Sequence, residues 1–251
     1  MKVTAVYFSP TGNTKRSTEA MALAIANDYD VFDITRYSNR SLTHEFDSDD
    51  FVIFGMPVYA GRIPTIAAPR LEGFTGKNTP CIIVATYGNR HYDDALVEME
   101  DIVTSHGFIV KGAAAVIGRH TYGEIQMDRP NENDLAESAE FAKTVFEHLA
   151  EQEKTAVTIP GNRPYRDGIY GGSHKPLTAD SCIGCGICKE GCPIRAIGED
   201  FKVNSELCIA CFRCIRNCPV GAKNMDTEAY QTFAKGFSEK LSKRRENEFF
   251  L

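Results

Sequence analysis

Eight of the nine cysteines in this chain form two copies of one pattern. The copies are Cys182-x2-Cys185-x2-Cys188-x3-Cys192-Pro193 and Cys208-x2-Cys211-x2-Cys214-x3-Cys218-Pro219, offset by 26 residues. Each iron of a four-iron cubane binds one thiolate, and in runs of this spacing the fourth cysteine ligates the other cluster. We therefore predict two [4Fe-4S] clusters, one held by Cys182, Cys185, Cys188 and Cys218 and the other by Cys192, Cys208, Cys211 and Cys214.

Zinc and disulfides are the alternatives for clustered cysteines. A structural zinc site uses four ligands, usually as two pairs with a spacer between them. Disulfide frameworks belong to small secreted proteins. Neither class accounts for three cysteines at i, i+3 and i+6 with a fourth four residues later, twice. The ninth cysteine, Cys81, stands in an apolar run and is expected to be an inert core thiol. On its eight cysteines the segment resembles the bacterial two-cluster ferredoxins, which implies electron transfer.

A second group of residues able to do chemistry follows an apolar run near the N-terminus. Residues 9–14 read Ser-Pro-Thr-Gly-Asn-Thr, and a helical pattern begins at their end. Hydroxyl groups, one glycine and the free N–H groups of a helix N-terminus can together bind a phosphate dianion. The alternative is an ordinary helix-capping turn. The segment matches neither the triphosphatase P-loop nor the G-x-G-x2-G dinucleotide fingerprint. It resembles the phosphate loop of the flavodoxins, which bind FMN.

Two further loops combine aromatic residues with glycine after apolar runs, at residues 57–64 and 86–92. In the flavodoxin family such loops sandwich the isoalloxazine ring, although a tyrosine at a strand end can also be a simple packing residue. The resemblance implies FMN as a cofactor and the following binding residues: Ser9, Thr11, Gly12, Asn13, Thr14, Pro57, Tyr59, Ala60, Gly61, Arg62, Thr86, Tyr87, Gly88, Asn89 and Tyr92.

Three other side chains near these loops leave alternatives open. Arg62 and Arg90 either offset the charge of a reduced flavin or are solvated surface groups. His120, in a fourth loop at residues 118–122, either donates a proton or caps the backbone, since imidazole titrates near neutral pH. We assign no catalytic residue.

The elements that position these loops follow from periodicity. Short apolar runs at residues 2–8, 30–34, 50–55, 80–86 and 108–118 alternate with helical patterns at 14–27, 93–106 and 132–152, and Gly107 suits a left-handed helix C-cap. This alternation predicts a doubly wound α/β fold with a five-stranded parallel sheet, whose ligands lie beyond the carboxyl ends of the strands. The sheet is flavodoxin-like by the resemblance, and a small α+β ferredoxin-like domain follows it.

We expect four segments along the chain. Residues 1–157 form the flavodoxin-like FMN-binding domain, 158–175 a linker rich in Gly and Pro, 176–225 the two-cluster ferredoxin domain and 226–251 an amphipathic C-terminal helix. Tyr165 and Tyr170 suggest that the linker packs across an interface. The helix places Tyr230, Phe233 and Phe237 on one face.

Composition narrows the function. A net charge of −6 argues against general nucleic-acid binding, and no leader or apolar run long enough for a transmembrane segment occurs in the 251 residues. We expect a cytoplasmic protein of an anaerobic host. The whole chain resembles the fused flavodoxin-ferredoxin proteins of anaerobes, sometimes called ferrodoxins.

That resemblance implies an electron carrier that relays electrons between its clusters and FMN and exchanges them with redox protein partners, either a ferredoxin-type donor or an acceptor reductase. A homodimer is a further option if one chain holds the cofactors too far apart. The alternative is an FMN-dependent reductase of a quinone, nitro, azo or enone compound fed by the clusters; a redox sensor is a third reading.

Overall fold

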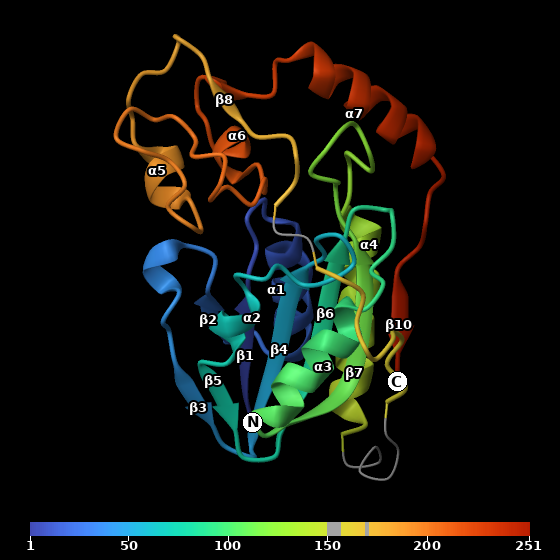
Figure 1. The fold of residues 1–251 in the computed structure, drawn as a ribbon. Coiled ribbons are helices and arrows are strands. Elements are labelled where there is room, and N and C mark those ends of the chain that lie inside the picture. The colour runs from blue at the N-terminus through green and yellow to red at the C-terminus, as the bar shows by residue number, and fades with distance from the viewer. Residues whose placement is uncertain (150–156, 169–170) are drawn as a thin grey trace.

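The computed structural model describes residues 1–149, 157–168 and 171–251 of the chain (Figure 1). Its N-terminal part alternates strands with helices. The elements of this part are β1 (Lys2–Tyr7), α1 (Asn13–Ile25), β2 (Asp30–Asp33), the 3-10 turn η1 (Tyr37–Asn39), β3 (His44–Phe46), β4 (Asp50–Pro57), α2 (Ala68–Leu71), β5 (Phe74–Gly76), β6 (Thr79–Tyr87), α3 (Ala95–Ser105), β7 (Phe108–Ile117) and α4 (Glu132–Glu147).

The main sheet has the strand order β10-β7-β6-β4-β1-β2, and its first five strands in the chain are parallel. Ile53 in the middle of β4, for example, pairs with Ala5 of β1 on one side and with Ile82 of β6 on the other. Counted along the chain, the parallel strands run 2-1-3-4-5, which is the flavodoxin-like order. The predicted fold class is confirmed. A small parallel sheet of β3 and β5 lies beside it.

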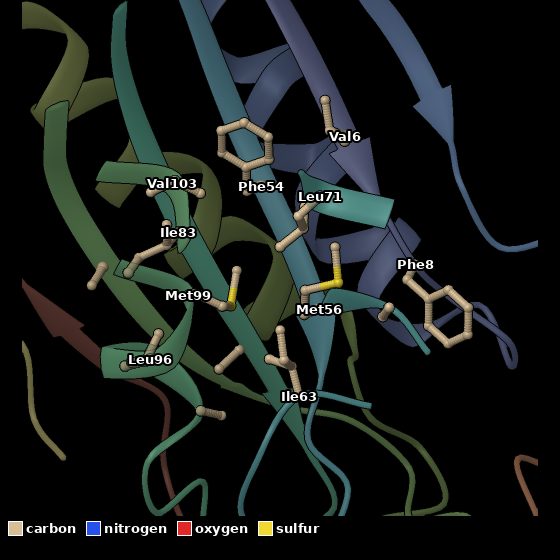
Figure 2. Packing of buried hydrophobic residues seen from close by; sticks show 14 of the residues in the cluster. Val6, Phe8, Phe54, Met56, Ile63, Leu71, Ile83, Leu96, Met99 and Val103 are labelled. Atoms are coloured by element: carbon tan, nitrogen blue, oxygen red, sulfur yellow. The ribbon is translucent and has the colours of Figure 1, made fainter. Parts of the chain in front are cut away.

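Helices cover both faces of the main sheet, and each face has its own buried cluster. On one face, α3 contributes Leu96, Met99 and Val103 to a cluster around β4 and β6 (Figure 2). On the other face, Met21 of α1 and Phe141 of α4 pack on the same strands. Every residue of β6 is buried. Burial of each large apolar side chain stabilises the fold by roughly 1.5–3 kcal/mol.

The helix ends follow local chemistry. α3 begins two residues later than predicted because Asp93 has φ of +43°, outside the helical region. Gly107 has φ of +87° at the end of this helix, as predicted. α4 begins with a capping box in which the Asn131 side chain and Asp134 satisfy each other's backbone N–H groups. α4 ends at Glu147, and the predicted continuation to residue 152 reaches past the described residues.

The cysteine-rich part sits over the carboxyl ends of the parallel strands (Figure 1). It has little regular structure, namely β8 (Leu177–Thr178) paired with β9 (Lys223–Asn224) and two short helices, α5 (Ile187–Gly191) and α6 (Arg213–Arg216). α7 (Glu228–Lys240) follows, and its N-terminus is capped by the Thr227 hydroxyl, which accepts a hydrogen bond from the Tyr230 N–H (3.2 Å).

The predicted C-terminal helix over residues 226–251 is wrong beyond Lys240. The chain turns back and forms β10 (Glu248–Phe250), an antiparallel sixth strand that pairs with β7 through Phe249 and Ala114. The fully buried guanidinium group of Arg129 anchors this return, since it binds the Asp134 carboxylate and donates to the carbonyl of Arg245 (2.5 Å). The cysteine-rich part therefore lies, in chain order, between two strands of one sheet.

The linker packs along α3. The Asn162 and Arg166 N–H groups donate to the two oxygens of Asp94 (both 2.8 Å), and the Tyr165 hydroxyl donates to Asp101. Tyr170, the other linker tyrosine, lies outside the described residues. Over the part of the chain that the structure describes, no helix combines the length and apolarity required to cross a bilayer.

Candidate cofactor sites

The two cysteine patterns fold into loops of the same local shape. Gly184 and Gly186 in the first loop have φ of +66° and +80°, and Ala210 and Phe212, at the same positions 26 residues later, have φ of +53° and +58°. Left-handed backbone at a residue with a side chain costs about 1–2 kcal/mol. Strained backbone of this kind is found mainly at functional sites. Here it curls the chain so that the Ala210 N–H points at the Cys208 sulfur (3.3 Å).

The structure brings the eight cysteines together in two sets. The first set lines a cavity together with Ile183, Phe201 and Lys223, and the second set lines a cavity together with Ile197, Ile209 and Phe212. In each set the fourth cysteine comes from the other pattern, which is the crossed arrangement that the spacing predicts. The first set comprises Cys182, Cys185, Cys188 and Cys218, and the second comprises Cys192, Cys208, Cys211 and Cys214.

The chemistry of these sets fits metal clusters larger than one ion. A cubane binds each of its four thiolates through a different iron, so four cysteines around one cavity match its ligand count. Burial raises the pKa of Cys214 to about 12. Its thiol therefore keeps its proton at neutral pH unless a bound metal removes it.

The two sets differ in their exposure to solvent. In the first set Cys185 is exposed, and the neighbouring Ile183 keeps 64% of its surface accessible. In the second set Cys211 is buried, and it belongs to the hydrophobic cluster on one face of the main sheet. One set therefore faces solvent and the other faces the flavodoxin-like domain.

One buried cation lies near both sets. Lys223 is 2% exposed, and its Nζ donates to the Thr178 hydroxyl (2.6 Å) and to the Phe201 carbonyl. Its charge favours the thiolate, and so acts to lower the pKa, of Cys188 in the first set and of Cys208 and Cys214 in the second. A fixed positive charge at this place would stabilise anionic clusters.

Residues 9–14, the phosphate loop, connect β1 to α1 at the carboxyl edge of the sheet. Gly12 adopts φ of +91° as the N-cap of α1, and it has no side chain with which to bind the free N–H groups of the first turn. The Ser9 hydroxyl accepts a hydrogen bond from the Lys15 N–H (3.0 Å). The loop borders a cavity, the loop cavity, together with Pro57, Tyr59, Thr86, Tyr87, Gly88 and Arg119.

The loop cavity contains buried polar atoms that no described residue satisfies. They are the Thr86 hydroxyl and Nε of Arg119. Burial lowers the pKa of Arg119. Since buried polar groups in proteins are almost always paired, these atoms point to a polar ligand.

A second cavity of about 250 Å³, the interdomain cavity, adjoins the first through Tyr59 and His120. Its walls come from six segments of the chain: the three loops after β4, β6 and β7, the linker, the second cysteine loop and α7. The lining includes Tyr59, Ala60, Arg90, Tyr122, Gly171, Gly172, Ile209, Ala210, Phe233 and Phe237. The Tyr122 and Phe233 rings pack edge to face with centroids 5.7 Å apart. Aromatic walls beside a phosphate-type loop suit a planar ligand that carries a phosphate.

Tyr59 and His120 have strongly perturbed environments. Burial of the Tyr59 hydroxyl raises its pKa well above the ordinary value, and the nearby Cys211 and Cys208 act in the same direction. Burial lowers the pKa of His120 to about 4. The His120 Nδ1 accepts a hydrogen bond from the Tyr122 N–H (2.8 Å), so the ring caps its own loop. This is the second of the two roles that the sequence left open.

Of the fifteen predicted binding residues, nine line the loop cavity and Ala60 lines the interdomain cavity. The nine are Ser9, Thr11, Asn13, Thr14, Pro57, Tyr59, Thr86, Tyr87 and Gly88. Asn13 also donates to the Arg119 carbonyl (2.8 Å).

The other five predicted residues line neither cavity, and four have different partners. Arg62 makes a bidentate pair with Glu98 (2.7 and 2.8 Å). Asn89 holds the chain after α7, and the Tyr92 hydroxyl donates to Glu248 of β10 (2.9 Å). The Gly61 carbonyl accepts from Asp94. Gly12 acts as the helix N-cap.

Sequence reasoning missed the second wall of the interdomain cavity. Ile209, Ala210 and Phe233 belong to segments that follow the phosphate loop by about two hundred residues. No local signal in the sequence assigns them to a flavin site. Arg119 was detectable, because it follows β7 at the carboxyl edge where ligands bind.

Comparison with known proteins identifies a dicluster domain in the C-terminal part of the chain. Residues 174–219 match the family model of the 4Fe-4S dicluster domain. A protein of Methanocaldococcus jannaschii, the uncharacterized protein MJ0298, is 26% identical over 142 residues, which cover 53% of this chain and 92% of that protein.

Solved structures of flavodoxins align with more than half of the chain. A flavodoxin from the domain Archaea is 14% identical, with 60% of this chain and 99% of that one covered and a TM-score of 0.38. The flavodoxin of Streptococcus pneumonia TIGR4 is 16% identical, with 59% and 99% covered and a TM-score of 0.41. The strand order of the main sheet carries the fold assignment independently.

Proposed function

Since the chain joins a flavodoxin-like fold to a 4Fe-4S dicluster domain, we propose that it is an electron-transfer protein that relays electrons between two [4Fe-4S] clusters and FMN. When bound, the clusters exchange one electron at a time, whereas FMN accepts one or two. Together they would convert between one-electron and two-electron transfer. The first cysteine set would hold one cluster and the second set the other.

One observation carries this proposal: the interdomain cavity and the second cysteine cavity share a wall. Ile209 lines both cavities, and it stands between Cys208 and Cys211 in the chain. Tyr59 lines the loop cavity and is close enough to the thiols of the same two cysteines for them to help burial raise its pKa. Cluster ligands and flavin walls thus adjoin within one chain, so the relay requires no second copy.

The residues of the chain have separate tasks in this relay. The phosphate loop and Thr86 bind the polar end of FMN, and Tyr59, Tyr122 and Phe233 enclose its ring and exclude water. Lys223 holds a positive charge beside both cysteine sets. The exposed rim at Cys185 and Ile183 is where a redox protein, either a ferredoxin-type donor or an acceptor reductase, would exchange electrons with the first cluster.

The size of the interdomain cavity favours a carrier over a reductase. Ligand pockets usually measure about 300–1,000 Å³, and this cavity has about 250 Å³. A flavin ring bound there would occupy much of this volume, which leaves less space for a quinone, nitro, azo or enone compound than a typical ligand pocket offers.

The test is the iron, sulfide and FMN content of protein purified without oxygen, followed by stepwise reduction. We expect about eight irons and one FMN per chain, as two cubanes and one flavin require, with clusters and flavin reducing in sequence. Tyr59→Ala should release FMN faster. A chain with a full iron content but no flavin would refute the relay and leave a ferredoxin with an attached recognition domain.

A further inference from the structure

Three guanidinium groups from the two domains gather beside the phosphate loop. Arg119 follows β7 and lines the loop cavity with residues of that loop. Arg213 opens α6 in the dicluster domain, and its Nη1 donates to the carbonyl oxygens of Pro10 (3.0 Å) and Ser9 (3.4 Å). Arg216, at the other end of α6, is close enough to Arg119 for their repulsion to contribute to lowering its pKa.

These cations lack a counterion in the protein. Among residues 1–149, 157–168 and 171–251, no carboxylate forms an ion pair with Arg119, Arg213 or Arg216. Glu124 attracts Arg119, but burial has the larger effect and lowers the pKa of this arginine. The Nε atoms of Arg119 and Arg213 are both buried and have no acceptor among the described residues.

Such an arrangement is unfavourable without an anion. Partial burial of a guanidinium group without an anion is unfavourable, and neighbouring like charges add to this cost. A second, independent group in the same cavity also lacks a partner, since Thr86 is only 5% exposed and its hydroxyl makes no hydrogen bond among the described residues. The cavity therefore presents unpaired donors and uncompensated positive charge together.

We propose that Arg119 binds a phosphate monoester dianion in the loop cavity, and that Arg213 fixes the phosphate loop to the dicluster domain so that both domains form the anion site. The inference rests on the proposed function, under which the phosphate is that of FMN. Guanidinium groups bind phosphate oxygens through paired, charge-assisted hydrogen bonds. The site would thus select FMN over riboflavin, which has the same ring and no phosphate.

The test compares FMN with riboflavin on the full chain with its clusters intact. Arg119→Gln should weaken FMN binding by about 10- to 100-fold, the loss expected for a hydrogen bond to a charged group, and should leave riboflavin binding unchanged. The FMN affinity of Arg119→Lys should lie between that of the wild-type chain and that of Arg119→Gln, because lysine keeps the positive charge but lacks the planar guanidinium group. Arg40→Gln is the matched control, since Arg40 is exposed and its guanidinium group contacts the carbonyl and the ring of Tyr37 in its own turn.

Inorganic phosphate provides a readout that does not depend on flavin. It should compete with FMN on the wild-type chain and raise its thermal unfolding midpoint, and both effects should disappear in Arg119→Gln.

If Arg119→Gln changes the affinities for FMN and for riboflavin by the same factor, or changes neither, the inference is overturned while the relay stands. A wild-type chain that binds neither flavin would overturn the relay, and the phosphate-dependent midpoint would then decide on the anion site alone. If Arg119→Gln loses its cluster absorbance, Arg119→Lys serves for every comparison.

Discussion

The guanidinium group of Arg70, in the flavodoxin-like domain, donates a hydrogen bond of 2.5 Å to the carbonyl oxygen of Pro193, in the dicluster domain. The same side chain is 5% exposed and donates to the Ile34 carbonyl (2.6 Å) and the Thr35 carbonyl (2.9 Å). Pro193 directly follows Cys192, a member of the second cysteine set. This buried cation, like Arg213, therefore links that set to the edge of the sheet.

Replacing Arg70 should loosen the contact between the domains. Arg70→Met leaves three buried carbonyl groups without their donor, so we expect the free energy of unfolding to fall by about 2–4 kcal/mol. Denaturant titration of the anaerobic protein measures this change. Arg40→Met, at an exposed site, should change stability by less than about 0.5 kcal/mol. Equal effects of the two substitutions would show that the Arg70 contact does not hold the domains together.

Paired double variants test the crossed arrangement of the cysteines. If Cys192 belongs with Cys208, Cys211 and Cys214, then Cys192→Ala combined with Cys211→Ala damages one cluster and leaves about four irons per chain. Cys192→Ala combined with Cys185→Ala then damages both clusters and leaves almost no iron. The uncrossed arrangement gives the opposite result for the two pairs, and iron analysis distinguishes them.

Lys223 should set the reduction potentials of both clusters. Loss of a buried positive charge makes the addition of an electron to a nearby anionic cluster less favourable, so Lys223→Met should lower both potentials by tens of millivolts. Redox titration followed by electron paramagnetic resonance measures each cluster. The control is Lys202→Met, because Lys202 is exposed. A shift in neither cluster would mean that the Lys223 charge is screened.

Asn89 should determine how firmly α7 closes the interdomain cavity. Its Nδ2 donates to the carbonyls of Leu241 and Lys243 (both 2.8 Å), and its Oδ1 accepts from the Arg245 N–H (3.1 Å). Its φ is +63°, so Asn89→Gly removes these bonds without straining the backbone. We expect stability to fall by about 1–3 kcal/mol and flavin release, followed by fluorescence, to accelerate.

Asn78→Gly is the matched control for that substitution. Asn78 is an exposed asparagine with φ of +60°. The same change there keeps the backbone effect and removes no hydrogen bond to Leu241, Lys243 or Arg245. Similar flavin release rates in the two variants would contradict a role for Asn89 in closing the cavity.

The buried imidazole of His120 should make stability depend on pH. Burial lowers its pKa from 6.5 to about 4, so the folded chain keeps the ring neutral while the unfolded chain takes up a proton. The contribution of His120 is therefore complete above pH 6.5 and is lost as the pH falls towards 4.

His120→Gln should flatten this part of the stability profile, as measured by circular dichroism, with cluster absorbance recorded separately. His148→Gln, at an exposed histidine, should leave the slope unchanged. Equal slopes in wild type and His120→Gln would contradict the prediction.

The sequence allowed prediction of the elements with strong local patterns. Four of the five parallel strands are apolar runs of six residues or more, and the ends of all five lie within two residues of the predicted ends. β10 was missed because three residues, Glu248–Phe250, are too few to show a period. Its partner β7 ends 131 residues earlier, so only the folded chain brings the two together.

The parts of the candidate site that lie on a single loop were predictable from the sequence. The parts formed where distant segments meet were not. The phosphate loop and the cysteine patterns are contiguous in sequence. Arg62, by contrast, lies in a predicted flavin loop, yet the Glu98 carboxylate on α3 turns it away from the cavities. Tertiary partners of this kind leave no trace in the spacing of residues.

The return of the chain to β7 has a consequence for biosynthesis. Domains generally fold as they are synthesised, at about 5–20 residues per second. Translation reaches β10 only after the whole dicluster domain, so the edge of β7 stays uncovered while the cysteines emerge from the ribosome. An uncovered strand edge invites pairing with other chains. The nascent chain is therefore open to aggregation through this edge until residues 248–250 have been made and have paired with β7.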